Sequence, residues 1–158
     1  MATTDTIQPR TALDEGSART AYRAMCHLDN ATAGLELDPL LRELIRVRAS
    51  MLNGCAYCVD MHTKDARAKG ETEQRLYAVA TWHEAPFFSP AERAAFALTD
   101  ALTLLAGNPL PDAVVAEAER KLGRDGLAAA TWVIVTINAW NRVAIASHDQ
   151  AGNYEPEG

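Results

Sequence analysis

Residues 38–62, DPLLRELIRVRASMLNGCAYCVDMH, decide the fold. Asp38 and Pro39 form a helix start, because Asp is a favoured N-cap residue and Pro a favoured first helical residue. Apolar residues then recur at spacings of four, three and four, which places them in one stripe along a helix. This stripe consists of Leu40, Leu44, Val47 and Met51. Asn53-Gly54 is typical of a helix end, so the stretch predicts one helix over 39–53 and a second that begins at or near Cys55.

The same helical periodicity continues through nearly the whole chain. It predicts further helices over 12–31, 55–69, 71–82, 89–107, 111–123 and 125–148. Ser89 and Glu92 form a capping box at the start of one of them. No segment shows the alternation of a β-strand, and no internal repeat is present. We therefore predict an all-α fold of six to seven helices, with a single domain over residues 1–148 and a frayed polar tail at 149–158.

The composition is that of an ordinary globular protein. Of 158 residues, 48% are hydrophobic and 23% are charged, so one domain can bury a sizeable core. The net charge is −6 and no run of Lys or Arg is longer than a pair, which argues against nucleic-acid binding. The apolar run 128–146 is interrupted by Asn138, Asn141 and Arg142, which favours a buried helix over a membrane span. The N-terminal residues lack the apolar core of a secretory signal, and we expect a cytoplasmic protein.

The last predicted helix is apolar on nearly every side. Its apolar residues include Trp132, Val133, Ile134, Val135, Ile137, Trp140, Val143 and Ile145. A helix that is hydrophobic all round is buried all round. Two arrangements satisfy this pattern: the other helices wrap around it, or part of it forms an interface between subunits. The sequence leaves both open.

Two cysteines and one histidine lie close together at Cys55, Cys58 and His62. On a helix that begins at Cys55, a rotation of about 100° per residue places these three side chains on the same face as Val59 and Ala66. Three charged residues fall on the opposite face, namely Asp60, Lys64 and Arg67. The sulfurs and the imidazole therefore share the apolar face, which favours a partly buried site over a surface accident.

The positions of these residues favour thiol chemistry. In a reducing compartment, a C-x-x-C pair is more typical of catalysis or metal binding than of a structural disulfide. The first turn of a helix stabilises an anion, so Cys55 and Cys58 stand where a thiolate is favoured. His62 follows Cys58 by four residues, a separation at which helical side chains meet, and can accept the thiol proton.

Glu43 is the candidate to orient His62. It flanks the apolar stripe of the preceding helix, and the turn at Asn53-Gly54 folds that helix back toward His62. We hypothesise that its carboxylate hydrogen-bonds His62 directly or through water, which would complete a Glu–His–Cys relay. The alternative is that Glu43 is a solvated partner of Arg42 or Arg46, three residues or fewer away on the same helix.

Each part of this group also has a simpler interpretation. A C-x-x-C in an apolar helix can be two buried thiols, and His62 can be a histidine at the edge of the core. A zinc site would use Cys55, Cys58, His62 and Glu43, but structural zinc favours a second Cys/His pair at a distance, and the sequence has none. We therefore expect no metal and no cofactor. Cys26 is predicted to be a packed thiol.

Three further residues have two interpretations each. Trp82 and His83 precede a Pro-containing loop, where they line a pocket mouth or simply end a helix. Tyr57, inside the C-x-x-C, shapes the dithiol or only packs against its surroundings.

Glu43, Cys55, Cys58 and His62 together reproduce the pattern E-x(11)-C-x-x-C-x-x-x-H. In this pattern, and in the stretches LIRVRASMLNGCAYCVDMHTKDARAKGETEQRLYAVATW, APFFSPAERAAFALTDALT and INAWNRVAI, the chain resembles the alkyl hydroperoxide reductase D (AhpD)-like branch of the carboxymuconolactone decarboxylase superfamily. The resemblance covers roughly residues 35–148 and is closest to the short, single-domain members. It implies an all-α fold with the C-x-x-C at the N-terminus of a central helix, and subunits that assemble into trimers or hexamers.

The resemblance also implies thiol peroxidase chemistry. Cys58 would attack a peroxide and become a sulfenic acid, and Cys55 would condense with it to a disulfide. His62 and Glu43 would relay protons, and a dithiol such as a lipoyl protein or a thioredoxin-like protein would restore the pair. Lactone decarboxylation is disfavoured, because the decarboxylase branch lacks the C-x-x-C. The alternatives that remain are a redox-responsive or disulfide-exchange module without turnover and a zinc-stabilised structural domain.

The chain departs from the larger members of the family at Tyr57, where they carry a histidine inside the C-x-x-C. This residue affects the expected route of the protons.

Overall fold

A computed structural model describes residues 10–156 of the chain. Over that range the fold is all-α, as predicted, and contains no strand. Its elements are η1 (Gly16–Ala18), α1 (Arg19–Ala33), α2 (Pro39–Asn53), α3 (Ala56–Ala68), α4 (Glu73–Ala78), η2 (Val79–Thr81), α5 (Pro90–Thr103) and α6 (Asp112–Ser147), where η denotes a short 3-10 helix.

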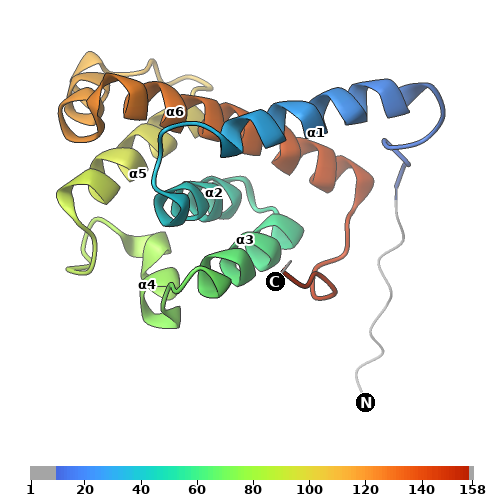
Figure 1. Ribbon diagram of the computed structural model, residues 1–158, viewed down its shortest axis with the longest axis horizontal. Coiled ribbons are helices and arrows are strands. Elements are labelled where there is room, and N and C mark those ends of the chain that lie inside the picture. Colours follow the sequence, from blue (N-terminus) through green and yellow to red (C-terminus); the bar gives the residue numbers. More distant parts are fainter. Residues whose placement is uncertain (1–9, 157–158) are drawn as a thin grey trace.

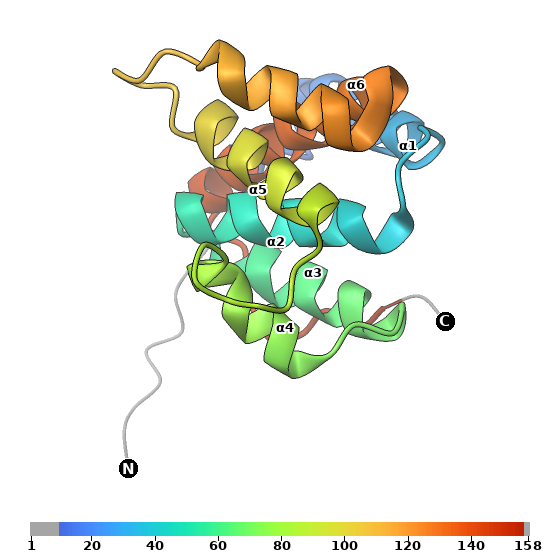
Figure 2. The ribbon, with the colours of Figure 1, turned by 90° about the vertical axis from the view of Figure 1, so that its left-hand side faces the viewer.

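Helix α2 lies at the centre of the molecule. α1 and α6 run along one side of it, and α3 and α4 lie on the other (Figures 1 and 2). α2 contacts α3, α5 and α6, and α5 also packs against α6. All residues from 41 to 50 except Arg46 are buried as a result. The helix that is wrapped on nearly every side is therefore α2, which carries the quoted stretch.

The core consists of two hydrophobic clusters that share α2. One cluster joins Leu44 and Val47 to Leu76, Val79, Trp82, Phe88 and Phe96 of the α4–α5 region. The other joins Leu41 and Ile45 to Ala95, Leu98, Ala130, Val133 and Ile134 of α5 and α6. Burying a side chain of this size stabilises the fold by about 1.5–3 kcal/mol. The apolar stripe of α2 thus holds both halves of the molecule together.

Three of the four charged residues on α2 are buried, and Arg48 is one of them. Arg48 donates two hydrogen bonds to Asp100 of α5, at 2.6 and 2.9 Å, and a third to the carbonyl of Ala80 at 3.1 Å. The indole N–H of Trp82 donates to the same Asp100 carboxylate at 3.1 Å. Removing one partner of such a group would leave a buried charge unpaired, which is strongly destabilising.

The turn between α2 and α3 fixes the orientation of the two helices. Gly54 ends α2 in the left-handed conformation, with φ of 70°. The amide of Cys55 then donates to the carbonyl of Ser50 at 3.0 Å, and Cys55 becomes the N-cap residue of α3. The predicted helix end and the predicted start at or near Cys55 are both confirmed.

A network of buried amides fastens this turn to α6. Asn53 donates to the side-chain oxygens of Asn138 at 3.0 Å and Asn141 at 2.8 Å. Asn141 is fully buried and donates in turn to the hydroxyl of Ser50 at 3.0 Å. These bonds satisfy the polar groups inside the apolar helix and set the distance between α6 and the α2–α3 turn.

The first predicted helix, 12–31, begins later than expected. Gly16 has a φ of 53°, which interrupts the helix, and α1 runs over Arg19–Ala33 instead. Residues 10–15 form a non-helical segment, the N-terminal strap, which is hydrogen-bonded to the end of α6 through the amide of Arg10 and the carbonyl of Ser147 at 2.9 Å. The prediction that residues 12–15 are helical is therefore wrong.

Two other boundaries differ from the prediction. The predicted helix 71–82 divides into α4 and η2, and the one over 89–107 ends at Thr103. The helices predicted over 111–123 and 125–148 are confirmed as the two segments of α6, which meet at a kink at Gly123, whose φ of 75° and ψ of 171° are not helical. The glycine therefore changes the direction of the helix axis.

The tail beyond α6 is ordered, which contradicts the predicted fraying of 149–158. Lys64 of α3 donates to the carbonyls of Gly152 at 3.3 Å and Tyr154 at 2.8 Å. The amide of Gly152 donates to Asp60, and the hydroxyl of Tyr154 donates to Asp65 at 2.8 Å. Polar residues in this tail pair with the charged face of α3, a long-range contact that composition does not reveal. Residues 157–158 lie outside the described range.

The apolar α6 is only partly covered by the rest of the chain. Its inward face carries Val133, Ile134 and Ile137, whereas Trp132 and Val135 are 50% and 46% exposed. Within residues 10–156, no helix has the combined length and apolar character that crossing a bilayer requires.

We expect Gly54→Ala to lower the free energy of unfolding by about 1 kcal/mol, because a Cβ disfavours the left-handed backbone at this turn. No atom lies within 4 Å of the added Cβ, so backbone strain alone is responsible. Gly34→Ala is the matched control, since Gly34 also caps a helix but has a φ of −85°. Urea unfolding followed by circular dichroism measures both, and equal effects would contradict the assignment of strain to Gly54.

Candidate functional site

Cys55 and Cys58 are joined by a disulfide at the start of α3, with their Cα atoms 5.4 Å apart. The sulfur of Cys55 also accepts the amide of Cys58 at 3.3 Å, as an N-cap side chain does. Both sulfurs thus lie where the amides and the dipole at the helix N-terminus favour a negative charge. The pair is buried, with 2% and 4% of each residue exposed, and packs against Ala144 of α6.

The predicted buried face of α3 is confirmed. Cys58, His62 and Ala66 are its buried residues, while Arg67 on the other side is exposed. Because α3 packs against α2, this buried face is also the one that meets Glu43.

The predicted contact between Glu43 and His62 is present and direct. Oε2 of Glu43 lies 3.0 Å from Nδ1 of His62, although 19 residues separate them along the chain. The other carboxylate oxygen, Oε1, receives Arg46 at 3.3 Å and Lys69 at 3.3 Å. The alternative pairing with Arg46 therefore exists as well, and Glu43 is a buried carboxylate with three donors rather than a solvated one.

The charge state of Glu43 fixes the proton on His62. Burial raises the pKa of Glu43, but the hydrogen bond from His62 and the positive charges of Arg46 and Lys69 outweigh burial and lower the pKa to about 2. The carboxylate is consequently ionised at neutral pH and accepts a hydrogen bond from Nδ1–H of His62. The second ring nitrogen, Nε2, is then left free to accept a proton from another group.

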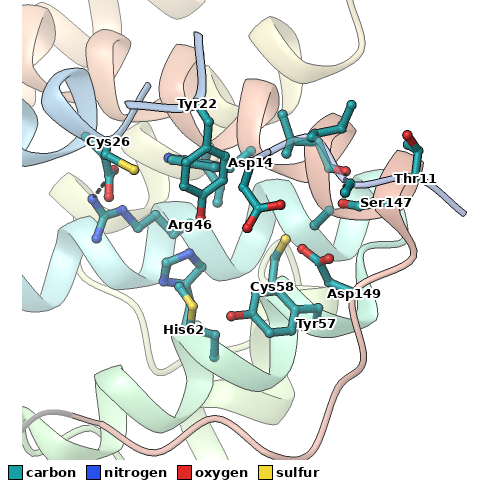
Figure 3. Close-up of a pocket in the computed structure, with 18 of the residues that line it drawn as sticks. Thr11, Asp14, Tyr22, Cys26, Arg46, Tyr57, Cys58, His62, Ser147 and Asp149 are labelled. Carbon is teal, nitrogen blue, oxygen red and sulfur yellow. Dashed lines mark hydrogen bonds and ion pairs between the residues drawn. The ribbon is translucent and has the colours of Figure 1, made fainter. Parts of the chain in front are cut away.

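A cavity of about 550 Å³ opens beside this group. Cys58 and His62 both line it, whereas Cys55 is not part of the lining (Figure 3). Its walls come from α1, α3, α6 and the N-terminal strap. The arrangement presents one sulfur and one imidazole to a small molecule and keeps the second sulfur behind them.

Several cavity residues were not identified as functional from the sequence. Tyr22, Cys26 and Asp29 line the cavity from α1. They follow one another by four and three residues, so the sequence predicts that they share one face of a helix. No local pattern indicates that this face is directed at the cysteines of α3. Cys26, predicted to be a packed thiol, is a free, half-buried cysteine in the cavity wall.

Tyr57 also lines the cavity, which gives the residue inside the C-x-x-C a place in the site. Burial and the nearby carboxylates of Asp149, Asp60 and Asp65 raise the pKa of its phenol. Its hydroxyl therefore stays protonated at neutral pH and can donate a hydrogen bond inside the cavity.

The potential metal ligands do not form the zinc site considered above. Glu43, His62 and Asp65 offer ligand atoms within 4.8 Å of one another, but the cysteine sulfurs are bonded to each other. Arg46 and Lys69 also place two positive charges on Glu43, and like charges disfavour a further cation there. The donor set thus fits a proton relay better than a metal.

Trp82 and His83 lie away from this cavity. Their rings stack with centroids 3.6 Å apart, and they line a second hollow together with Asp100 of α5. Trp82 is also a core residue bonded to Asp100, and it directly follows the end of η2, so both interpretations describe it in part.

Comparisons with known proteins identify the family of this chain. The sequence profile of the carboxymuconolactone decarboxylase family matches residues 19–101. The uncharacterized protein YdfG of Bacillus subtilis (strain 168) is 37% identical over 131 residues, which cover 83% of this chain and 89% of YdfG. The chain belongs to the carboxymuconolactone decarboxylase family.

Solved structures show the same fold. A protein of unknown function from Agrobacterium tumefaciens, proposed to be an antioxidant defence protein AhpD, is 32% identical, with a TM-score of 0.88 over 93% of this chain and all of that one. The debrominase Bmp8 is 20% identical, with a TM-score of 0.76 over 85% of this chain and 73% of that one, and shares the fold alone. The AhpD-like fold and the C-x-x-C disulfide support a redox role for this family member, but membership does not identify the reaction.

We expect the stabilising effect of Glu43 to depend on pH. A pKa of about 2, against an ordinary value of 4.5, corresponds to about 3 kcal/mol of stability. Because the folded pKa is the lower one, this stability is fully present above pH 4.5 and is lost as the pH falls toward 2. The difference in unfolding free energy between the natural chain and Glu43→Gln should shrink over that range.

Urea unfolding at a series of pH values measures this difference. Glu36→Gln, at an exposed position, is the control and should show no comparable change. A difference that stays constant from pH 7 to pH 3 would show that Glu43 is not held ionised by its partners.

Proposed function

We propose that the protein is a thiol-dependent peroxidase, in which Cys58 reduces a hydroperoxide and a dithiol reductant restores the enzyme. One observation carries the proposal: Cys58 lines the cavity beside His62, while its disulfide partner Cys55 lies behind it. A peroxidase with two cysteines needs one sulfur that meets the peroxide and a second within bonding reach. The C-x-x-C on α3 supplies both.

In the first step, His62 accepts the proton of the Cys58 thiol at Nε2. The Cys58 thiolate attacks the terminal oxygen of a hydroperoxide, ROOH. The O–O bond breaks, Cys58 becomes a sulfenic acid, and the leaving alkoxide takes the proton from His62 to give the alcohol ROH. One peroxide is thereby reduced by two electrons, and the sulfur of Cys58 is oxidised by two.

In the second step, the Cys55 thiol attacks the sulfenic sulfur of Cys58. The S–O bond breaks, and the hydroxide leaves as water together with the Cys55 proton. The product is the disulfide that the structure contains. A dithiol of the cytoplasm, such as a lipoyl or thioredoxin-like protein, then supplies two electrons and two protons, restores both thiols and leaves as its own disulfide.

Glu43 acts in this scheme as a positioning residue. Its ionised carboxylate holds Nδ1–H of His62 and turns Nε2 toward the cavity. It also stabilises the imidazolium that forms when His62 takes the Cys58 proton, because an ionised carboxylate favours a positive neighbour.

The burial of both sulfurs favours one second function. With 2% and 4% of Cys55 and Cys58 exposed, a protein reductant has little direct access to the disulfide. Oxidation without efficient reduction would make the chain a redox-responsive or disulfide-exchange module rather than a peroxidase. Slow, stoichiometric disulfide formation that no dithiol reverses would support this function.

The two cysteines should respond differently to mutation. We expect Cys58→Ser to abolish peroxide consumption coupled to dihydrolipoamide, since the remaining cavity thiol, Cys26, is not on the face of α3 that carries His62. Cys55→Ser should retain one reaction with peroxide and then stop, because the sulfenic acid of Cys58 has no partner. Mass spectrometry after trapping with dimedone detects that species on Cys58.

The matched control is Cys26→Ser, which removes the third thiol of the same cavity and should leave turnover intact. Peroxide consumption that persists in Cys58→Ser, or a sulfenic acid that forms on Cys55 instead, would contradict the assigned roles.

We also propose that the protein forms a homo-oligomer, a trimer or a hexamer. The outer side of α6 carries a stripe of small and apolar residues that the rest of the chain leaves open, at spacings of four and three residues. It consists of Ala128, Trp132, Val135, Ala139 and Ala146, and the charged Arg142 interrupts it between Ala139 and Ala146. A contact with a second copy would bury this stripe and complete the cover of α6.

Trp132→Lys should reduce the mass in solution toward that of one 17.1 kDa chain. Tyr77→Lys is the control, since Tyr77 is also an exposed aromatic residue, 70% exposed, but lies on α4. Size-exclusion chromatography with light scattering measures both. A natural chain that is monomeric at micromolar concentration would contradict the proposal.

A further inference from the structure

The two ends of the chain supply carboxylates to the cavity. Asp14 belongs to the N-terminal strap and Asp149 follows α6, yet both line the cavity that contains Cys58. Figure 3 shows the two carboxylates pointing inward on either side of the Cys58 sulfur. The hydrogen bond between Arg10 and Ser147 ties the strap to the end of α6 and so keeps these segments together.

Neither carboxylate is neutralised by a basic side chain in the part of the chain that the structure describes. Arg19, the basic residue bonded to the strap, donates to the backbone carbonyl of Asp14 and not to its carboxylate. Glu15 lines the same rim and adds a third negative charge.

Arg46 is the one arginine or lysine among the described residues that line the cavity, and its charge is already compensated. Arg46 lies 3.0 Å from Asp29 and 3.3 Å from Glu43, so two carboxylates share its charge. An anion that enters the cavity would therefore compete with Asp29 and Glu43 for Arg46. The uncompensated negative charges of Asp14 and Asp149 would also repel it.

The field of these carboxylates reaches the groups inside. Burial raises the pKa of Tyr22, and the charges of Asp14 and Asp149 raise it further. For Tyr57, burial acts first and Asp149 is the foremost of the charges that add to it. Both phenols lie in the cavity wall, so the negative potential is present where a ligand would be placed.

Part of the remaining wall is apolar. It includes Met61 of α3 and Ile137, Trp140 and Val143 of α6. A cavity of about 550 Å³ with such a wall is large enough to hold an organic molecule and offers it dispersion contacts. The apolar surface inside favours an organic ligand, and the negative charge at the rim disfavours an anionic one.

We propose that Asp14 and Asp149 select uncharged molecules for reaction at Cys58 and disfavour anions. Given the peroxidase function proposed above, on which this part rests, the substrate class is neutral organic hydroperoxides rather than hydroperoxides that carry a carboxylate. The selectivity itself is a property of the cavity and does not depend on the electrophile being a peroxide.

The same carboxylates oppose the Cys58 thiolate, since like charges repel. The N-terminus of α3 and His62 offset that repulsion within the site. Neutralising the carboxylates should therefore speed all reactions of Cys58 to some degree. Only a ratio of rates between a neutral and an anionic reagent isolates the selection.

Iodoacetamide and iodoacetate give this ratio, because they are nearly equal in size and differ in charge. In the reduced Cys55→Ser chain, Cys58 is the only thiol of the proteolytic peptide that contains it. Mass spectrometry of this peptide measures the rate at which Cys58 is alkylated. We expect the amide-to-acetate ratio to exceed that of N-acetylcysteine by roughly tenfold at low salt. It should approach the N-acetylcysteine value in Asp14→Asn/Asp149→Asn and at 0.5 M salt.

The matched control is Glu36→Gln/Glu119→Gln, which removes the same two charges from exposed positions outside the cavity lining. The amide-to-acetate ratio of this control should equal that of the chain in which Asp14 and Asp149 are unchanged. A ratio that matches N-acetylcysteine before any mutation, or one that both double variants lower equally, would overturn the proposal.

Cumene hydroperoxide and its para-carboxylate test the substrate class on the natural chain. We expect kcat/KM for the neutral compound to be the higher by a similar factor, and Asp14→Asn/Asp149→Asn to narrow the gap. Equal values for the two compounds would overturn the substrate class. If neither compound oxidises Cys58, the peroxidase function fails, while the alkylation ratio still decides the selection.

Discussion

An ionised carboxylate in the middle of a helical core is the constraint on which the site depends. Glu43 lies on the most enclosed helix of the molecule, and leaving its charge unpaired there would cost several kcal/mol. Its donors come from α2 itself, from α3 and from the residue just beyond α3. The buried carboxylate of Glu43 must be paired with donors. This requirement explains both why α3 packs on α2 and why the proton of His62 lies on Nδ1.

The hairpin of α2 and α3 brings the cysteines and His62 next to Glu43. The sharp turn at Gly54 lets α3 run back along α2, and the amide network around Asn141 joins that turn to α6. α6 in turn packs Ala144 on the cysteines and supplies apolar wall to the cavity. The reactive sulfur is consequently held by contacts from three helices.

Local signals were sufficient for the parts of this structure that local interactions decide. The N-cap at Asp38, the helix end at Gly54 and the shared face of Cys58 and His62 each depend on residues a few positions apart. The contact between Glu43 and His62 was also predictable, because a short turn leaves two helices few ways to pack. The spacing of Cys58 and His62 in the sequence was therefore sufficient to predict that they share one face of α3.

The remaining features depend on contacts between segments far apart in the chain. The tail was expected to fray, yet it binds the charged face of α3 some 90 residues away. The strap looked helical, yet Gly16 and the bond to Ser147 hold it over the cavity. Both ends of the chain thus shape the chamber, whereas the reacting groups stand on the interior helices. Relatives can accordingly vary their ends and alter what the chamber admits, while the folding core and the thiol chemistry stay the same.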